Sequence, residues 1–168
     1  FVLSLLYCVF SKKPRIYMGS SPHIFCALAA TLGGWARRVP VVIEVRDLWP
    51  ESFQVVLNRR LPVIEPFLEL VAKLVYSHAH SLIVISQGMK DYLHSFSYLK
   101  EKRILVAPNG IDTERVSFQG KLRTTDEFVF GYIGNIGFAQ QIEVIVEAAK
   151  ILHARRSDIE FRVELTGR

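Results

Sequence analysis

The feature that most constrains this chain is the regular alternation of short, β-branched apolar runs with segments of helical length. The clearest run, residues 39–45, is almost continuously apolar, which is typical of a parallel strand buried on both faces. Further strands are expected at 15–18, 81–85, 103–107, 128–133 and 159–165, and helices at 23–37, 63–79, 87–96 and 139–154. This repetition predicts an α/β fold, a doubly wound parallel sheet with helices on both faces.

A polar and irregular stretch at 113–126 interrupts the alternation and predicts two structural units. The first would span residues 1–112 and the second residues 127–168, with 113–126 as a linker. The second unit holds only one strand, one helix and another strand, so it is expected to be incomplete. A length of 168 residues, half of them hydrophobic, suits one domain and part of another.

Charge and cysteine content restrict the partners of the chain. A net charge of +5 favours acidic partners such as nucleotides, phosphates and anionic lipid surfaces. Nucleic acid is not expected as a partner, because aromatic-rich basic strands and zinc-ligand spacings are missing. The two cysteines, Cys8 and Cys26, form no CxxC motif, and a reduced, cytosolic setting is the simplest interpretation.

The first ten residues, FVLSLLYCVF, are apolar and end at Ser11-Lys-Lys-Pro14. This run is too short to span a bilayer, which requires roughly 20 residues. We interpret it as the end of a buried helix. The alternative is a segment that dips into a membrane surface.

Charged residues follow the 39–45 strand abruptly, in the sequence EVRDLWPES at 44–52. Ligands of open α/β sheets bind beyond the carboxyl ends of the strands. At this position Asp47 is a candidate base or a group that orients a hydroxyl. Arg46 could keep Asp47 ionised or bind a phosphate, and Trp49 could offer a flat apolar face to a sugar or lipid. The alternative is a solvated turn with a structural ion pair.

Three further polar segments follow predicted elements. The GNIG sequence at 134–137 lies between a strand and a helix, where backbone N–H groups favour a diphosphate, although no Lys or Arg occurs within 134–141. A tight turn between strand and helix is the equally open alternative. The Asn109–Asp112 stretch predicts a turn with Gly110 at positive φ. His78 and His80 are expected to cap a helix rather than bind metal.

Taken together and in order, these segments resemble glycosyltransferase family 4, most closely its branch for bacterial O-antigen, capsule or colanic-acid polysaccharide. The resemblance rests on Ser20-Ser-Pro22, the 44–52 block, Val84-Ile-Ser86, Pro108–Asp112 and GNIGFAQ at 134–140. It implies the GT-B fold, in which two Rossmann-like domains face each other across a cleft. It also implies transfer with retention of anomeric configuration and no bound metal or other cofactor.

The resemblance assigns roles residue by residue. Asp47 would lie beside the reacting centre, and Ser20, Ser21, Arg46, Trp49 and Glu51 would surround it on the acceptor side. Asn109, Gly110 and Asp112 would mark the passage between domains. The donor diphosphate would face Gly134, Asn135, Gly137 and Gln140. Asn135 and Gln140 stand where the wider family often has Arg and Lys, and Gln141 where this branch often has Gly.

The implied reaction moves a sugar, an N-acetylhexosamine, from a UDP-sugar to a polyprenyl-diphosphate-linked glycan at the inner face of the cell membrane. The family's first glycine-rich loop and its acidic donor-binding pair have no counterpart in the sequence, so the chain resembles the middle of such an enzyme and alone is expected to be inactive. The alternatives are an inactive remnant or binding module and, less favoured, a nucleotide-sugar epimerase.

Overall fold

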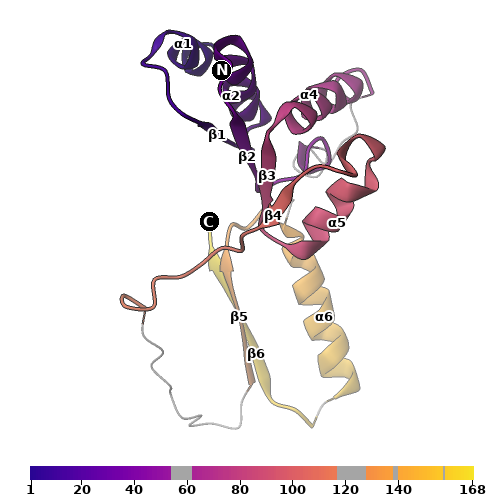
Figure 1. Ribbon diagram of the computed structural model, residues 1–168. Helices are drawn as coiled ribbons and strands as arrows, with labels where there is room; N and C mark the ends of the chain where they lie inside the picture. The colour runs from indigo at the N-terminus through magenta and orange to yellow at the C-terminus, as the bar shows by residue number, and fades with distance from the viewer. Residues whose placement is uncertain (54–61, 117–127, 138–139, 157) are drawn as a thin grey trace. The chain divides into compact units, whose positions relative to one another are not determined.

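The computed structural model of the chain describes residues 1–53, 62–116, 128–137, 140–156 and 158–168. The chain divides into two compact units, Phe1–Gly110 and Ile111–Arg168. The first carries a four-stranded sheet and the second a two-stranded sheet, and the described strand pairs are all parallel (Figure 1). The α/β class predicted from the sequence is confirmed, as is the parallel sheet flanked by helices.

The four-stranded sheet has its strands in chain order, β1 (Tyr17–Ser20), β2 (Val41–Val45), β3 (Ser81–Val84) and β4 (Ile104–Val106). Neighbouring strands are joined through α2 (Ile24–Arg37), α4 (Glu65–His78) and α5 (Gln87–Ser95), the last followed by the short 3₁₀ helix η1 (Ser97–Leu99). Because the strands are parallel, their carboxyl ends lie along one edge of the sheet. The loops that follow β1 and β2 are therefore neighbours.

Burial alternates along β2. Val41, Ile43 and Val45 are buried, whereas Val42 and Glu44 are only half-buried. The prediction that this strand is buried on both faces is therefore wrong, and its apolar run encodes one fully buried face. That face builds the core of the first unit together with apolar side chains of β3 and the helices, among them Leu82, Val84, Val75, Tyr76 and Leu93.

The first helix, α1 (Val2–Phe10), has no buried residue, which corrects the expectation of a buried helix. Its backbone is nevertheless held against α2. Gly33 of α2 permits the approach, because a Cβ at this position would lie 2.5 Å from Cβ of Cys8. The Arg37 guanidinium donates to the carbonyls of Val9 and Ser11, and the Tyr17 hydroxyl donates to that of Cys8.

Several helix ends follow the sequence. Ser86 caps α5 by accepting a hydrogen bond from the Met89 N–H at 3.3 Å. The predicted capping role of His78 is confirmed, since its Nδ1 lies 3.0 Å from the Leu74 carbonyl oxygen in the last turn of α4. Within the described residues, no helix combines the length and the apolar composition needed to cross a bilayer.

The second unit pairs β5 (Phe128–Gly134) with β6 (Phe161–Gly167) and carries α6 (Ile142–Arg155) between them in the chain. The register aligns Gly134 with Gly167. The predicted start of the helix at 139 falls outside the described residues, as do 54–61 of the long stretch after β2 and 117–126 of the predicted linker. The described helix begins three residues later than predicted.

Candidate functional site

The loops after β1 and β2 are joined by hydrogen bonds at the carboxyl edge of the sheet. Ser20 and Glu44 are register partners, and the Ser20 hydroxyl donates to Oε2 of Glu44 at 2.7 Å. The N–H of Ser21 donates to the Glu44 carbonyl at 3.0 Å. These bonds extend the β1–β2 pairing into the loops and fix where residues 46–53 begin.

Ser21 and Trp49 hold the second loop in place. Ser21 is fully buried, and its hydroxyl donates to the Asp47 carbonyl at 3.1 Å and accepts from the Arg46 N–H at 3.3 Å. The Trp49 indole N–H donates to the Ser21 carbonyl at 2.9 Å, and the indole stacks on Phe53 at 5.7 Å between centroids. Both side chains therefore position the loop, and their predicted contact with an acceptor stays a prediction.

This loop leaves the Asp47 side chain exposed at the sheet edge. In the described part of the chain its carboxylate has no hydrogen-bond or ion-pair partner, although its own backbone carbonyl is bonded to Ser21. Arg46 is exposed beside it and forms no ion pair with it. The structure thus holds the Asp47 backbone firmly and presents an unpaired carboxylate, an arrangement suited to receiving a substrate hydroxyl.

Glu51, on the same loop, lies against α5. Its Oε1 accepts a hydrogen bond from the Tyr92 hydroxyl, while its Oε2 is buried without a partner in the described residues. The hydrogen bond to the Glu51 carboxylate, with smaller contributions from burial and from the negative charges of Glu51 and Tyr98, raises the pKa of Tyr92 to about 12. Burial first, and then the charges of Glu51 and Glu69, raise the pKa of Tyr98.

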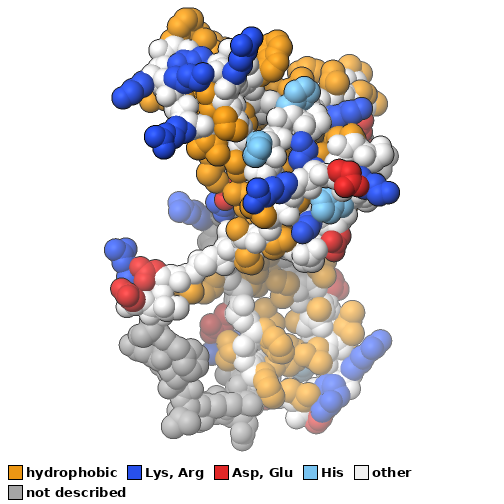
Figure 2. Space-filling model, viewed as in Figure 1, with side chains coloured by type: hydrophobic (Ala, Val, Ile, Leu, Met, Phe, Trp, Pro, Cys, Tyr) orange, Lys and Arg blue, Asp and Glu red, His pale blue; other side chains and the backbone are white. Residues whose placement is uncertain are grey.

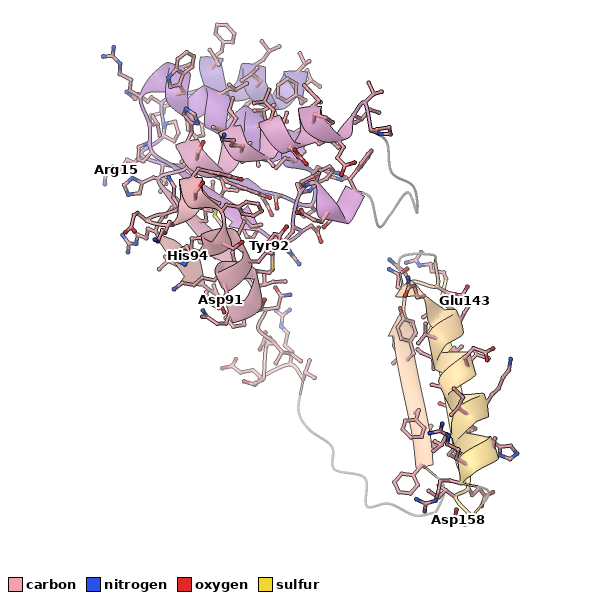
Figure 3. All side chains as sticks on the ribbon, turned by 90° about the vertical axis from the view of Figure 1, so that its right-hand side faces the viewer. Arg15, Asp91, Tyr92, His94, Glu143 and Asp158 are labelled. Atoms are coloured by element: carbon pink, nitrogen blue, oxygen red, sulfur yellow. The ribbon has the colours of Figure 1, made fainter. Side chains whose placement is uncertain are left out.

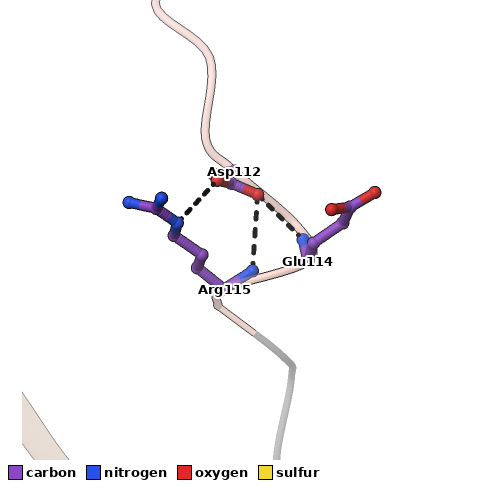
Figure 4. Close-up of polar contacts among 3 residues, drawn as sticks. All are labelled: Asp112, Glu114 and Arg115. Carbon is purple, nitrogen blue, oxygen red and sulfur yellow. Dashed lines mark hydrogen bonds and ion pairs between the residues drawn. The ribbon is translucent and has the colours of Figure 1, made fainter.

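The 109–112 segment lies at the boundary between the two units. Asn109 and Gly110 are exposed, and Gly110 does not adopt the positive φ predicted for it, so that prediction is wrong. Asp112 caps a turn: its Oδ1 accepts from the N–H groups of Glu114 and Arg115, and its Oδ2 pairs with the Arg115 guanidinium at 3.3 Å (Figure 4). These contacts account for Asp112 as a turn residue.

In the second unit, the loop after β5 lies beside the end of β6. A Cβ at Gly167 would lie 1.9 Å from the Gly134 carbonyl oxygen, so this close approach requires a glycine. The Ile136 N–H donates to the Arg168 carbonyl at 2.9 Å. β-Pairing therefore brings a guanidinium-bearing residue to the backbone of the loop that contains Asn135 and Gly137. The position of Arg168 just after a predicted strand is the sequence signal that could have identified it.

The start of α6 is shaped by two glutamines. The Gln140 N–H donates to the Gly137 carbonyl at 3.1 Å, and Gln141 is the N-cap residue with φ 48° and ψ 49°. Left-handed backbone of this kind favours glycine. The resemblance implies that similar chains often have glycine at 141, and this backbone conformation gives a physical reason for it. Phe138 and Ala139 of the predicted loop lie outside the described residues.

A metal site has no support in the described residues, where no three His, Cys, Asp or Glu side chains gather closely enough to hold an ion. Comparison with known proteins gave one family. The model of Glycosyltransferase Family 4 matches residues 3–115, which include the β1 and β2 loops and the whole four-stranded sheet. A search of curated proteins found no match.

Proposed function

The chain belongs to glycosyltransferase family 4, and on that premise we propose that it serves the transfer of an N-acetylhexosamine from a UDP-sugar to a polyprenyl-diphosphate-linked glycan, with retention of anomeric configuration. The product would be a bacterial surface polysaccharide of the O-antigen or capsule type. The observation that carries this proposal is the Asp47 loop, which lies within the matched region and presents an unpaired carboxylate beyond the carboxyl end of β2.

Asp47 acts on the acceptor in this proposal. Its carboxylate orients the attacking hydroxyl oxygen toward the sugar carbon and takes the hydroxyl proton as the new C–O bond forms and the bond from that carbon to the UDP oxygen breaks. Ser21 and Trp49 fix the backbone on either side, so the carboxylate is positioned without being neutralised by a protein cation. Arg46 and Ser20 are proposed to contact the acceptor from the same edge.

The loop after β5 binds the donor diphosphate in this proposal. Backbone N–H groups near Gly134, Asn135 and Gly137 precede the amino terminus of α6, which favours negative charge. Arg168 supplies the positive charge that residues 134–141 lack, and Gln140 offers a further amide donor. Stabilisation of the departing UDP phosphate is then electrostatic and needs no proton from the protein.

The acceptor is proposed to be presented at a membrane surface. Leu3, Leu6, Tyr7 and Phe10 follow the i, i+3, i+4, i+7 spacing of one face of α1, and their side chains are between 47% and 83% exposed. Figure 2 shows apolar side chains with Lys and Arg side chains around them over α1 and α2; the exposed basic residues include Lys12, Lys13, Arg15 and Arg38. This combination favours the interface of an anionic leaflet, here the inner face of the cell membrane.

The test uses the full-length protein, a UDP-N-acetylhexosamine and a lipid-linked glycan acceptor, with release of UDP as the measurement. Asp47→Ala should lower acceptor-dependent release by about 100-fold or more, the usual scale for loss of a group in proton transfer. Asp158→Ala is the control, because Asp158 pairs with Arg156 at the end of the second unit far from the donor loop (Figure 3). Undiminished release in the Asp47 variant would remove Asp47 from the mechanism.

A further inference from the structure

A cavity of about 250 Å³ lies between α4 and α5 and is closed on one side by the loop that follows Asp47. α4 contributes Glu69, Lys73 and Tyr76, and α5 contributes Tyr92. The loop contributes Leu48, Trp49, Pro50 and Glu51, and Phe96 and Tyr98 follow α5. All of these residues belong to the first unit and are described in the structure.

Aromatic rings form one continuous wall of this cavity. The Tyr92 and Phe96 rings meet edge to face at 5.2 Å between centroids, and Phe96 lies 5.6 Å from Tyr98. Tyr92 is 37% exposed and Tyr98 36%, so a ligand can reach both. Apolar ring surface lined by a few polar groups is the usual composition of a small-molecule site.

Glu51 provides the acceptor oxygens of this wall. One oxygen is bonded to Tyr92 and the other, Oε2, is buried without a partner in the described residues. A buried acceptor that lacks a donor costs roughly 1–3 kcal/mol, and more when it is charged. Rotation of the terminal carboxylate bond is soft, so either oxygen can accept from a ligand hydroxyl in the cavity.

A side chain of the protein, Lys73, already occupies the cation position on the aromatic wall of the cavity. The Lys73 ammonium lies 5.4 Å from the centre of the Tyr98 ring, where a ligand cation would otherwise bind. A neutral ligand rich in hydroxyl groups therefore fits the walls better than an ammonium compound. The cavity is also smaller than the roughly 300–1,000 Å³ of sites for drug-sized ligands, which favours one ring over two.

We propose that this cavity binds a single pyranose ring of the acceptor glycan, with Glu51 accepting hydrogen bonds from the ring hydroxyls and Tyr92 packing against a ring face. The proposal rests on the proposed function and adds a sugar-binding subsite to it. Glu51 lies four residues beyond Asp47 on the same loop. One sugar of the acceptor bound in the cavity would therefore place the adjacent sugar of the same glycan near Asp47, where its hydroxyl can react.

The experiment measures binding of methyl N-acetylglucosaminide and methyl galactopyranoside to the full-length protein by saturation-transfer NMR. Saturable binding of at least one glycoside is expected. Glu51→Gln should weaken it about 10-fold or more, because hydrogen bonds to charged groups contribute roughly 1.5–3 kcal/mol. Tyr92→Ala should have a similar effect, whereas Tyr92→Phe keeps the ring and should retain binding within about threefold. Glu101→Gln, an exposed charge change outside the cavity, should have no effect.

The outcomes separate this proposal from the proposed function. No saturable glycoside binding, or binding that Glu51→Gln and Tyr92→Ala leave unchanged in folded protein, would overturn the subsite while acceptor-dependent UDP release could still stand. Binding of choline in place of glycosides would also overturn it. A saturating UDP-sugar should leave glycoside binding unchanged, and competition would assign the cavity to the donor sugar instead. Glycoside binding without any UDP release would support the subsite and count against the transferase.

Discussion

At the scale of single residues, the carboxyl edge of the sheet holds three acidic side chains in three different states. Glu44 is bonded to Ser20 and Glu51 to Tyr92, whereas Asp47 is exposed and its carboxylate has no partner among the residues that the structure describes. The sequence predicted that Asp47 differs in role from its neighbours and offered Arg46 either as the group that keeps it ionised or as a phosphate ligand. Among the described residues the two form no ion pair. The partner of Glu51 is 41 residues away in the chain, so no local pattern could have revealed it.

The Glu51–Tyr92 contact predicts how the protein responds to alkaline pH. Tyr92 ionises near pH 10 when unfolded and near 12 when folded, so its contribution to stability is complete below pH 10 and is lost as the pH rises toward 12. Glu51→Gln removes the carboxylate and should move the Tyr92 titration down toward pH 10. Tyrosinate absorbance of this variant, with Tyr92→Phe to identify the band, measures the shift. An unchanged titration would show that Glu51 does not bind Tyr92.

Gln141 gives a second prediction at this scale. A φ of 48° strains a residue that has a Cβ by about 1–2 kcal/mol. Glycine at this position would relieve the strain, but it also makes the unfolded chain more flexible, which offsets part of the stabilisation. Gln141→Gly should therefore raise the free energy of unfolding by about 0.5–1 kcal/mol. The neighbouring Gln140 has no positive φ, so Gln140→Gly should give no increase. Urea unfolding compares the two, and equal losses in both would contradict the assigned backbone conformation.

At the scale of elements, the sequence predicted the type and order of the strands and helices well and their ends less well. The alternation of apolar runs is a local property, and it located α2, β2, β3 and α5 within two residues. The first strand was placed at 15–18, whereas β1 runs from Tyr17 to Ser20. The predicted strand ended before Gly19, whereas Gly19 lies inside β1. A Cβ at Gly19 would be 3.0 Å from the Ala27 Cα, so the glycine allows α2 to pack closely against the strand.

Gly34 tests this kind of close packing between a helix and the sheet. A Cβ at Gly34 would lie 2.1 Å from Cγ2 of Val41 and 2.9 Å from the Val39 carbonyl oxygen. Gly34→Ala should therefore destabilise the protein by about 1–3 kcal/mol, the usual cost of overpacking. Gly88→Ala is the control, because in the described part of the chain no atom outside the neighbouring helix backbone would lie within 4 Å of the added Cβ, and α5 should gain about 0.5–1 kcal/mol from alanine. Thermal unfolding that ranks the two variants in the opposite order would refute this packing.

The α1 helix shows why an apolar run does not by itself predict burial. Most of its side chains are exposed and none is fully buried, even though the backbone carbonyls at its end are bonded to Arg37 and Tyr17. The sequence does not distinguish a helix held by its backbone from one buried by its side chains. The segment that was expected in the core thus supplies an apolar surface instead. This outcome favours the alternative of a membrane-dipping segment, which the sequence left open.

The α1 surface predicts binding to anionic vesicles. The full-length protein should float with vesicles that contain phosphatidylglycerol and less with phosphatidylcholine alone, because each basic residue near an anionic surface contributes about 1 kcal/mol. The double variant Leu3→Glu, Phe10→Glu should lose most of this binding and keep its thermal stability, since both side chains are exposed. Binding that is equal on neutral vesicles, or unaffected by the double variant, would contradict a role for α1 at the membrane.

At the scale of the whole molecule, the family match and the structure agree on the first unit, and the second unit extends the chain beyond the matched residues. The sequence alone indicated the family through the order of its strand-end motifs. The sequence places Arg168 after a predicted strand, but it could not show that Arg168 lies beside the donor loop, because that proximity depends on the pairing of β5 with β6. Nor could it show that Ser21 and Trp49 are engaged in fixing the Asp47 loop, since their bonds span 26 and 28 residues.

The proposed reaction moves a sugar from a nucleotide to a lipid-linked glycan, and the most direct measurement follows the sugar itself. Full-length protein is incubated with tritiated UDP-N-acetylglucosamine or UDP-N-acetylgalactosamine and a polyprenyl-diphosphate glycan, and the lipid is extracted into butanol. We expect label to enter the lipid fraction with one UDP released for each sugar, and neither to occur without the lipid acceptor. Label that stays in the aqueous phase with every acceptor, as an altered nucleotide-sugar or as free sugar, would contradict it.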